Sequence, residues 1–334
     1  MHEFLREMNA EVLNKYDAFT VGELPHTPDP NHVLRYISSE DKQMSMVFQF
    51  DIVDLGIRKG GVDKYDYDGF TLPQFKAVVE RWQTFHDDTA GWTTAFCENH
   101  DQGRSVSRYA NDSPEWRERS AKLLALFLCS KNGTLFLYQG QEIGMINIPE
   151  DWTIDDCQDV EGIGAYNAVA KKTNNDPKAL AKTWEAIRLV GRDNARTPMQ
   201  WDDTAFAGFT DNEKGAWMRV NDTYKTINVA SQVDRADSPL TFWKQMLRLR
   251  KEYRDIFIHG YFEGTDMENE HTFVFTKYYK GKRAVVALNF TAEERKWHKD
   301  SFEGSLKFLV GNVDGVDGSG DILAGYEGRI YLVE

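Results

Sequence analysis

The stretch EFLREMNAEVLNKYDAFTVGE, residues 3–23, contains the two patterns whose repetition decides the fold. Its first part predicts an amphipathic helix, because the apolar side chains fall on one helical stripe: Phe4, Leu5, Met8, Val12 and Leu13. The apolar run AFTVG at 18–22 then predicts a short buried strand, which ends at the carboxylate of Glu23. A helix therefore leads into a strand, and the strand ends in a charged side chain.

The same alternation continues along the chain. Further strands are predicted at MSMVFQF (44–50), WTTAFCE (92–98) and GTLFLY (133–138). Helices are predicted at TLPQFKAVVERWQTF (71–85), SPEWRERSAKLLALFLCS (113–130) and SPLTFWKQMLRLRKEY (238–253). The first of these helices has Thr71 as its cap and Gln74 in the capping-box position, and the other two begin with Ser-Pro. Strands separated by helices imply a parallel sheet that is covered on both faces.

The pattern changes after about residue 258. HTFVFTKYY and RAVVALNF, on either side of a Lys-Gly-Lys turn, predict an antiparallel hairpin, and SLKFLVGN and RIYLVE predict further strands. We therefore expect an α/β domain at 1–257 and an all-β domain at 258–334. The segment from about 145 to 235 is rich in Asp, Asn, Gly and Pro, and is expected to form short helices and loops.

Composition and charge exclude several classes of partner. A net charge of -13 without a Lys/Arg run argues against nucleic-acid binding. No stretch approaches the roughly 20 apolar residues of a membrane span, and the start lacks the apolar core of a signal peptide, so we expect a cytoplasmic protein. The content of nine Trp, fourteen Tyr and twenty Phe suits the binding of sugar rings.

The remaining composition signals favour structural roles. The cysteines Cys97, Cys129 and Cys157 are widely spaced and show no C-x-x-C, which predicts buried thiols rather than a disulfide framework or a zinc site. DGVDGSGD at 314–321 lacks the final Glu of a calcium loop, so turns between strands are expected. We predict no metal and no cofactor. Trp92, Trp201 and Trp217 receive no binding role, since a Trp in a large chain usually packs in the core.

Polar side chains follow the ends of the predicted strands. Glu23 ends the first of them, Asn99, His100 and Asp101 follow a second, and Gln139, Gln141 and Glu142 follow a third. Any one of them could cap the next helix, but ligands in parallel α/β folds gather beyond the carboxyl ends of strands. Two carboxylates and a histidine at one rim suggest glycoside hydrolysis. Glu23 suits the general acid, with a pKa raised by partial burial and by a neighbouring carboxylate.

At these residues the chain resembles the α-amylase family of glycoside hydrolases, glycoside hydrolase family 13. The resemblance is carried by VGE at 21–23, ENHDQ at 98–102, YQGQEIG at 138–144 and RDNARTPMQWD at 192–202. RTPMQWD followed by AGFT is typical of the maltase and oligo-1,6-glucosidase branch, and the likeness is greatest to fungal cytosolic maltases. It covers essentially the whole chain.

The resemblance implies a role for each matching residue. Glu23 would be the general acid/base, and Asp101 would grip the sugar hydroxyls and stabilise the transition state. His100 would bind the same glucose unit, and Arg192 would close the pocket behind it, with Arg196 the less favoured candidate. Without the family match, a core ion pair for either arginine and a buried structural histidine are equally good interpretations. Glu142 would order the end of its strand.

The chain also departs from the family pattern. The family builds an eight-stranded barrel followed by a β domain, and its nucleophile is an Asp on the fourth strand, in a segment similar to GFRID that is absent from these 334 residues. The four strand-helix units match strands five to eight. The expected fold is therefore the C-terminal half of a (β/α)8 TIM barrel followed by a small antiparallel β-sandwich, a truncated enzyme without activity of its own.

The predicted function is that of a retaining α-glucosidase acting on a small oligosaccharide such as maltose, isomaltose or sucrose. A transglycosylating relative of the trehalose or isomaltulose synthase type shares these motifs, and the sequence leaves both open, as it does the oligomeric state. A catalytically silent amylase-like interaction protein is a third interpretation. The fourth is a complete four-stranded doubly wound domain with a β appendage.

Overall fold

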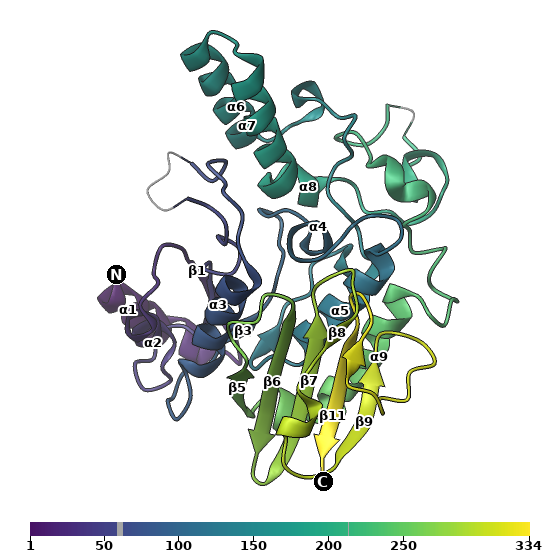
Figure 1. The fold of residues 1–334 in the computed structure, drawn as a ribbon. Helices are drawn as coiled ribbons and strands as arrows, with labels where there is room; N and C mark the ends of the chain where they lie inside the picture. The colour runs from purple at the N-terminus through teal and green to yellow at the C-terminus, as the bar shows by residue number, and fades with distance from the viewer. Residues whose placement is uncertain (59–62, 213) are drawn as a thin grey trace.

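The computed structural model of the chain describes residues 1–58, 63–212 and 214–334. Short parallel strands and helices occupy its middle, an antiparallel sheet lies at one end, and a helical hairpin projects at the opposite end (Figure 1). The molecule is thus a mixed α/β structure with a sheet-rich C-terminal part, as the sequence predicts.

The four predicted strands are present and pair in parallel, which confirms the interpretation of the apolar runs. β1 (Val21–Leu24) pairs with β2 (Met46–Gln49), and β3 (Thr94–Ala95) pairs with β4 (Thr134–Leu135). The two pairs are linked where the Thr94 hydroxyl donates to the Val47 carbonyl at 3.1 Å. The strands are shorter than predicted because the apolar runs continue into buried backbone without ladder pairing, as at Phe96 and Cys97.

Five helices precede or separate these strands, and not all of them begin where their capping signals predict. They are α1 (His2–Glu11), α2 (Pro30–Ile37), α3 (Leu72–Thr84), α4 (Ser105–Tyr109) and α5 (Arg117–Cys129). The capping box of α3 is formed, since Thr71 N donates to the Gln74 side chain at 2.8 Å and Gln74 N to the Thr71 hydroxyl at 3.5 Å. The predicted start of α5 at Ser113 is wrong. The Ser113 carbonyl accepts from the amides of Trp116 and Arg117, so residues 113–116 form a turn before the helix.

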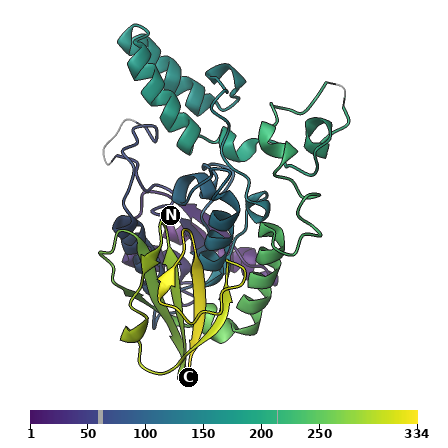
Figure 2. The same ribbon diagram turned by 45° about the vertical axis from the view of Figure 1, so that its right-hand side comes forward.

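The segment from 145 to 235 holds longer helices than expected. α6 (Val160–Thr173) and α7 (Pro177–Val190) each have 14 residues, and α8 (Asp193–Arg196) follows. Asp159 and Asp176 cap the two long helices, which pack against each other as the projecting hairpin of Figures 1 and 2. The expectation of short helices failed because α6 buries only Gly162, so its sequence lacks a strong apolar stripe.

The C-terminal part is an antiparallel sheet of five strands, preceded by α9 (Pro239–Glu252) and α10 (Arg254–Phe257). The order is β5 (Tyr261–Thr265), β6 (Thr272–Tyr279), β7 (Lys282–Asn289), β11 (Gly328–Val333) and β9 (Leu306–Gly311). The hairpin predicted from 271–290 is confirmed as β6 and β7, joined at Lys280 and Gly281, which both have positive φ. β8 (Arg295–Lys296) and β10 (Ile322–Leu323) form a separate small antiparallel pair.

One hydrophobic cluster joins the helices to the sheet. Phe75 of α3 and Phe127 of α5 pack with Phe273 of β6, and all three are fully or almost fully buried. The opposite face of the sheet forms a second cluster around Trp297 and Tyr331. Both faces of the sheet are therefore covered, and the division at 257/258 remains a prediction about chain organisation.

The predictions for the cysteines and for the tryptophans have different outcomes. The cysteines are free and buried, as predicted, and burial raises the pKa of Cys97 and Cys129 to about 12. Trp201 and Trp217 are 49% and 57% exposed, so the expectation that they pack in the core is wrong. Both lie on loops outside the helices and strands.

Candidate active site

A cluster of charged side chains surrounds Asp101, in the loop that follows β3. The guanidinium of Arg196 donates from Nη2 to Asp101 Oδ1 at 2.5 Å, and Arg196 Nε donates to the carbonyl of His100 at 2.9 Å. Arg192 Nε and His100 Nε2 lie 3.3 and 3.6 Å from the same Asp101 oxygen. The structure thus brings together three of the predicted site residues and adds Arg196.

The two arginines contact Asp101 differently. Arg196 makes a formed hydrogen bond, whereas Arg192 Nε lies between Asp101 and Glu161, 3.4 Å from Glu161 Oε2, without a hydrogen bond to either. Both guanidinium groups also lie within 3.7 Å of Asp159 Oδ1. Burial alone would lower the pKa of Arg192, but these three carboxylates raise it. The distances favour Arg196, the less favoured candidate, as the tighter partner of Asp101.

The start of the projecting hairpin fixes Asp159. Its carboxylate accepts from Gly162 N at 3.1 Å as the cap of α6, and its side chain is only 4% exposed. The amides of Gln158 and Asp159 both donate to Asp193 Oδ2 at 3.0 Å. Asp193 begins α8, the short helix that carries Arg196, so the hairpin and both arginines form one hydrogen-bonded unit.

Lys64 ties the loop after β2 into the cluster. Its ammonium lies 3.0 Å from Glu161 Oε2 and donates to the Asp101 carbonyl at 3.5 Å, and burial lowers its pKa although Glu161 acts in the opposite sense. Burial raises the pKa of nearby Asp54, while the charge of His26 lowers it in part. Because His26 belongs to the loop after β1, the loops that follow β1, β2 and β3 gather at the same end of the strands.

Glu23 occupies β1, in parallel register with Phe48 of β2. Its side chain is exposed, so the expected partial burial is absent. The physical reason is its position on a strand that pairs with β2 and with no other strand in the part of the chain that the structure describes. Glu23 therefore lies on β1, Asp101 lies in the loop after β3, and β2 stands between these two strands.

A buried ion pair supports the Asp101 loop from beneath. Glu98 and Arg104 have side chains that are each 1% exposed, with 3.2 Å between Glu98 Oε1 and Arg104 Nη1, and Ser105 N donates to Glu98 Oε2 at 2.5 Å. Arg104 also donates to three carbonyls, those of Gln139, Asn194 and Ala195. These contacts join the ends of β3 and β4 to α8 and hold Arg196 opposite Asp101.

The side chains of residues after β4 form hydrogen bonds with backbone groups. Glu142 Oε2 accepts from Gly140 N at 2.7 Å, and burial raises the pKa of this carboxyl. The Tyr138 hydroxyl donates to the Ala195 carbonyl at 3.1 Å. The ordering role predicted for Glu142 agrees with this geometry.

Sequence reasoning missed Asp159, Glu161 and Lys64. They carry no strand-end signal, and they reach Asp101 through the fold of loops and of the hairpin. Within residues 1–58, 63–212 and 214–334, no group of three or more His, Cys, Asp or Glu side chains is placed to hold a metal ion. Across the same residues, no helix combines the length and the apolar character needed to cross a bilayer.

Comparison with known proteins places the chain in a family. Residues 1–260 match the profile of the α-amylase catalytic domain. The chain belongs to the α-amylase family. It is 41% identical to an α-glucosidase of Candida albicans over 338 aligned positions, which span 100% of this chain and 58% of that protein. An α-glucosidase of Schizosaccharomyces pombe is 39% identical, across 88% of this chain and 50% of the relative.

Solved structures of the family give the same result. The chain superposes on an isomaltulose synthase from Klebsiella sp. LX3 with a TM-score of 0.92 and 27% identity, covering 100% of this chain and 58% of that one. A trehalose-6-phosphate hydrolase of Bacillus licheniformis gives a TM-score of 0.89 at 33% identity, with 100% and 59% covered. This member of the α-amylase family thus spans 50–59% of the length of these relatives.

Proposed function

We propose that the chain carries the acid/base and sugar-gripping part of a retaining α-glucosidase site. Glu23 acts as the general acid/base, and Asp101 binds the ring hydroxyls more tightly as the sugar approaches the oxocarbenium-like transition state. His100 and Arg192 bind the same terminal glucose, and Arg196 fixes the orientation of Asp101. The substrate class is a small α-linked oligosaccharide such as maltose, isomaltose or sucrose.

The observation that carries this proposal is the geometry of the Asp101 carboxylate. Its contacts with His100, Arg192 and Arg196 are all made to Oδ1, and the side chain is 24% exposed. Among the contacts of the described residues, Oδ2 is left as an acceptor for a sugar hydroxyl. A fixed, charged and accessible oxygen of this kind suits recognition of a neutral polyol, because hydrogen bonds to charged groups are the stronger ones.

The architecture that we propose follows from the family. β1 to β4 correspond to strands five to eight of a (β/α)8 barrel, with the catalytic part at 1–257 and a small β-sandwich domain at 258–334. The helices before residue 258 and the five-stranded sheet after it support this division into two domains. A cytoplasmic location and the absence of a cofactor belong to the same proposal.

The 334-residue chain on its own is proposed to be inactive. A retaining mechanism places a nucleophilic carboxylate about 5 Å from the acid, and loss of the nucleophile removes nearly all of the rate. The sequence contains no segment similar to GFRID to supply that carboxylate. The purified chain should therefore not release nitrophenol from p-nitrophenyl α-glucoside. Turnover that disappears in Glu23→Gln would overturn this.

A chimera tests the assigned roles directly. This chain would replace the matching 58% of the Candida albicans α-glucosidase, whose remaining part supplies the rest of the barrel. The chimera should hydrolyse maltose, and Glu23→Gln and Asp101→Asn should each lower kcat at least about 100-fold. Glu40→Gln, an exposed glutamate on a loop, is the matched control and should leave kcat unchanged.

The same chimera separates the competing functions. The likeness to a solved isomaltulose synthase supports a transglycosylating enzyme as the second candidate. Incubation with sucrose would yield glucose and fructose from a hydrolase, and a rearranged disaccharide from a synthase. A folded chimera without either product would support the silent interaction protein instead.

A further inference from the structure

Three successive residues in the loop after α8 adopt left-handed backbone conformations. Their φ values are 54° at Phe206, 59° at Ala207 and 62° at Gly208. For the two residues that are not glycine, this conformation costs of order 1–3 kcal/mol each and persists where the surroundings enforce it. The Ala207 carbonyl accepts from the amides of Trp201 at 2.8 Å and Asp202 at 3.2 Å, and Ala207 is fully buried. Strain of this kind is found mainly at binding and catalytic sites.

The strained turn brings the Phe206 ring to the wall of an open cavity of about 450 Å³. The ring lies against Gly215, where a Cβ would come within 3.0 Å of its edge. Met218, Arg219, Asp222 and Tyr224 are also on the wall. The volume lies in the range of small-ligand pockets. None of these residues belongs to the Asp101 cluster.

Polar groups on the wall are held in place. The Arg219 guanidinium contacts Asp151, Asp156 and Asp222 at 3.1, 3.2 and 2.7 Å, and lies 4.8 Å above the Trp152 ring. The side chain of Asp222 is nevertheless 60% exposed, so its carboxylate retains acceptor positions toward the cavity.

The surroundings favour a neutral, hydroxyl-rich ligand. Phe206 and Tyr224 are on the wall, and Trp217, between the wall residues Ala216 and Met218, is 57% exposed. Aromatic faces beside a fixed carboxylate suit a sugar ring, which presents C–H groups to the aromatic face and hydroxyls to the acceptor. A net charge of -13 and three carboxylates around Arg219 disfavour an anionic ligand.

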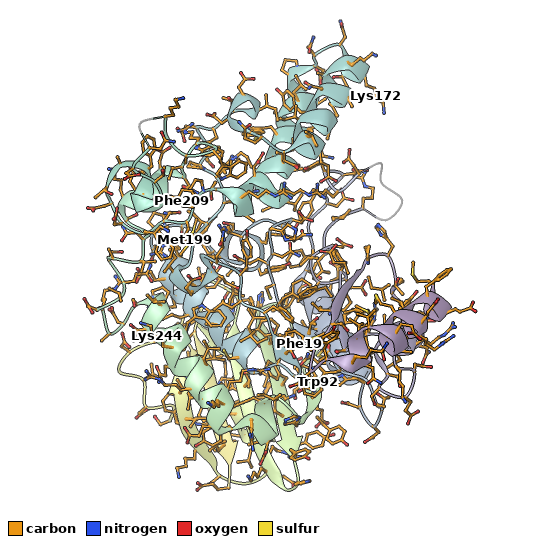
Figure 3. All side chains as sticks on the ribbon, turned by 180° about the vertical axis from the view of Figure 1, so that it is seen from behind. Phe19, Trp92, Lys172, Met199, Phe209 and Lys244 are labelled. Atoms are coloured by element: carbon orange, nitrogen blue, oxygen red, sulfur yellow. The ribbon has the colours of Figure 1, made fainter. Side chains whose placement is uncertain are left out.

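We propose that this cavity binds a neutral saccharide, such as the glucose unit at the end of a malto-oligosaccharide, as a second site apart from Asp101. The loops of residues 200–212 and 214–225 lie beside the hairpin of α6 and α7 in Figure 2. In the view from behind, Phe209 lies near Met199 at the upper left, and Phe19 lies nearer the centre (Figure 3). The binding does not depend on Glu23 or on a nucleophile, so it stands apart from the catalytic proposal.

The test is a titration of the 334-residue chain with maltotriose, followed by saturation-transfer NMR of the ligand and by Trp fluorescence. Saturable binding is expected in the wild type. Asp222→Asn should weaken it at least about 10-fold, since a hydrogen bond to a charged group is lost. Phe206→Leu should weaken it as well, while Asp101→Asn and the control Phe209→Ala should leave this site intact.

Two outcomes would overturn the proposal. One is the absence of saturable binding by the folded wild type. The other is binding that disappears in Asp101→Asn but is unchanged in Asp222→Asn, because the sugar would then occupy the Asp101 cluster. Asp222 is exposed, so its amide variant is expected to keep the wild-type melting temperature and to decide the matter even if Phe206→Leu fails to fold. Neither outcome bears on the catalytic proposal, which the activity of the chimera tests separately.

Discussion

The first helix and the C-terminal sheet both have clear apolar patterns in the sequence, but only the sheet buries its apolar side chains. α1 buries none of its residues, its Phe4 is 70% exposed, and Phe19, ahead of β1, is 71% exposed. β6 buries six of its eight residues, because helices cover one face of the sheet and the β8 and β10 segments cover the other. An apolar stripe thus tells which face of an element is ready to pack, and a partner must still be present to cover it.

Polar contacts hold α1 in place instead. His2 Nδ1 and Gln43 Oε1 are 2.9 Å apart, and the Asn9 side chain donates to the Gln43 carbonyl at 3.2 Å. The His2 ring lies 4.3 Å from the ring of Tyr36. Such contacts each contribute about 1 kcal/mol at most, whereas a buried aromatic contributes several times more. The sheet should therefore dominate the free energy of unfolding, and α1 should contribute little.

The largest expected effect tests this difference with matched substitutions. Phe275→Ala removes a fully buried ring that lies 4.9 Å from Phe262 and 5.1 Å from Phe273, and should lower the free energy of unfolding by about 3–5 kcal/mol. Phe4→Ala, at the exposed stripe, should change it by less than about 0.5 kcal/mol. Urea unfolding followed by circular dichroism measures both, and equal losses would contradict the comparison.

The second prediction makes the same comparison with charges. Glu98→Gln leaves the buried Arg104 guanidinium without its counter-charge and should cost about 3 kcal/mol, with a loosened contact between Arg196 and Asp101. Glu11→Gln breaks an exposed pair between the last residue of α1 and Lys15, and should cost less than about 0.5 kcal/mol. The same urea titration measures both, and a neutral Glu98→Gln would show that the carbonyl partners of Arg104 suffice.

The sequence predicts elements where local chemistry decides them. The capping box at Thr71, the start of α9 at Ser238 and the hairpin of β6 and β7 depend on residues near each other in the chain, and all are present. The start of α5 was wrong because a Ser-Pro signal also suits a turn. The remaining features depend on contacts between residues that are far apart in the sequence.

The candidate site shows the same limit. Strand-end polarity and the family motifs led to Asp101, His100 and Arg192, which the structure places together. Asp159, Glu161 and Lys64 come from elements whose approach to Asp101 depends on how loops and the hairpin fold back. The exposure of Glu23 was equally beyond prediction, since it reflects how many strands flank β1 and not the residues around it.

A third prediction concerns pH at the junction between α3 and the sheet. Burial, together with the charge of Lys277, lowers the pKa of His86 to about 4, and burial raises the pKa of Asp87 to about 6. Since an unfolded histidine has a pKa near 6.5, the neutral His86 stabilises the fold above that pH, and this contribution is lost as the pH falls toward 4. Asp87 acts in the opposite sense, because its stabilising contribution is lost as the pH rises through 6.

The two variants should therefore diverge. The difference in unfolding free energy between wild type and His86→Asn should fall by about 2 kcal/mol from pH 6.5 to pH 4.5. The free energy of unfolding of Asp87→Asn should rise relative to that of the wild type as the pH rises from 4 to 7. Urea titrations across this range measure both changes. Parallel pH profiles for the wild type and His86→Asn would show that the imidazole titrates normally.

The smallest effect on stability returns to α1. Phe4→Gln combined with Met8→Gln replaces two exposed apolar side chains, 70% and 39% exposed, by a good helix former, so unfolding should change by less than about 0.5 kcal/mol. Self-association at high concentration should nevertheless fall, because a contiguous apolar stripe promotes it. Sedimentation velocity measures this, with Arg6→Gln and Glu7→Gln on the same helix as the control. Should the apolar variant instead lose more than about 1 kcal/mol while association stays unchanged, the stripe packs within the monomer, and the contrast between α1 and the sheet would be one of degree.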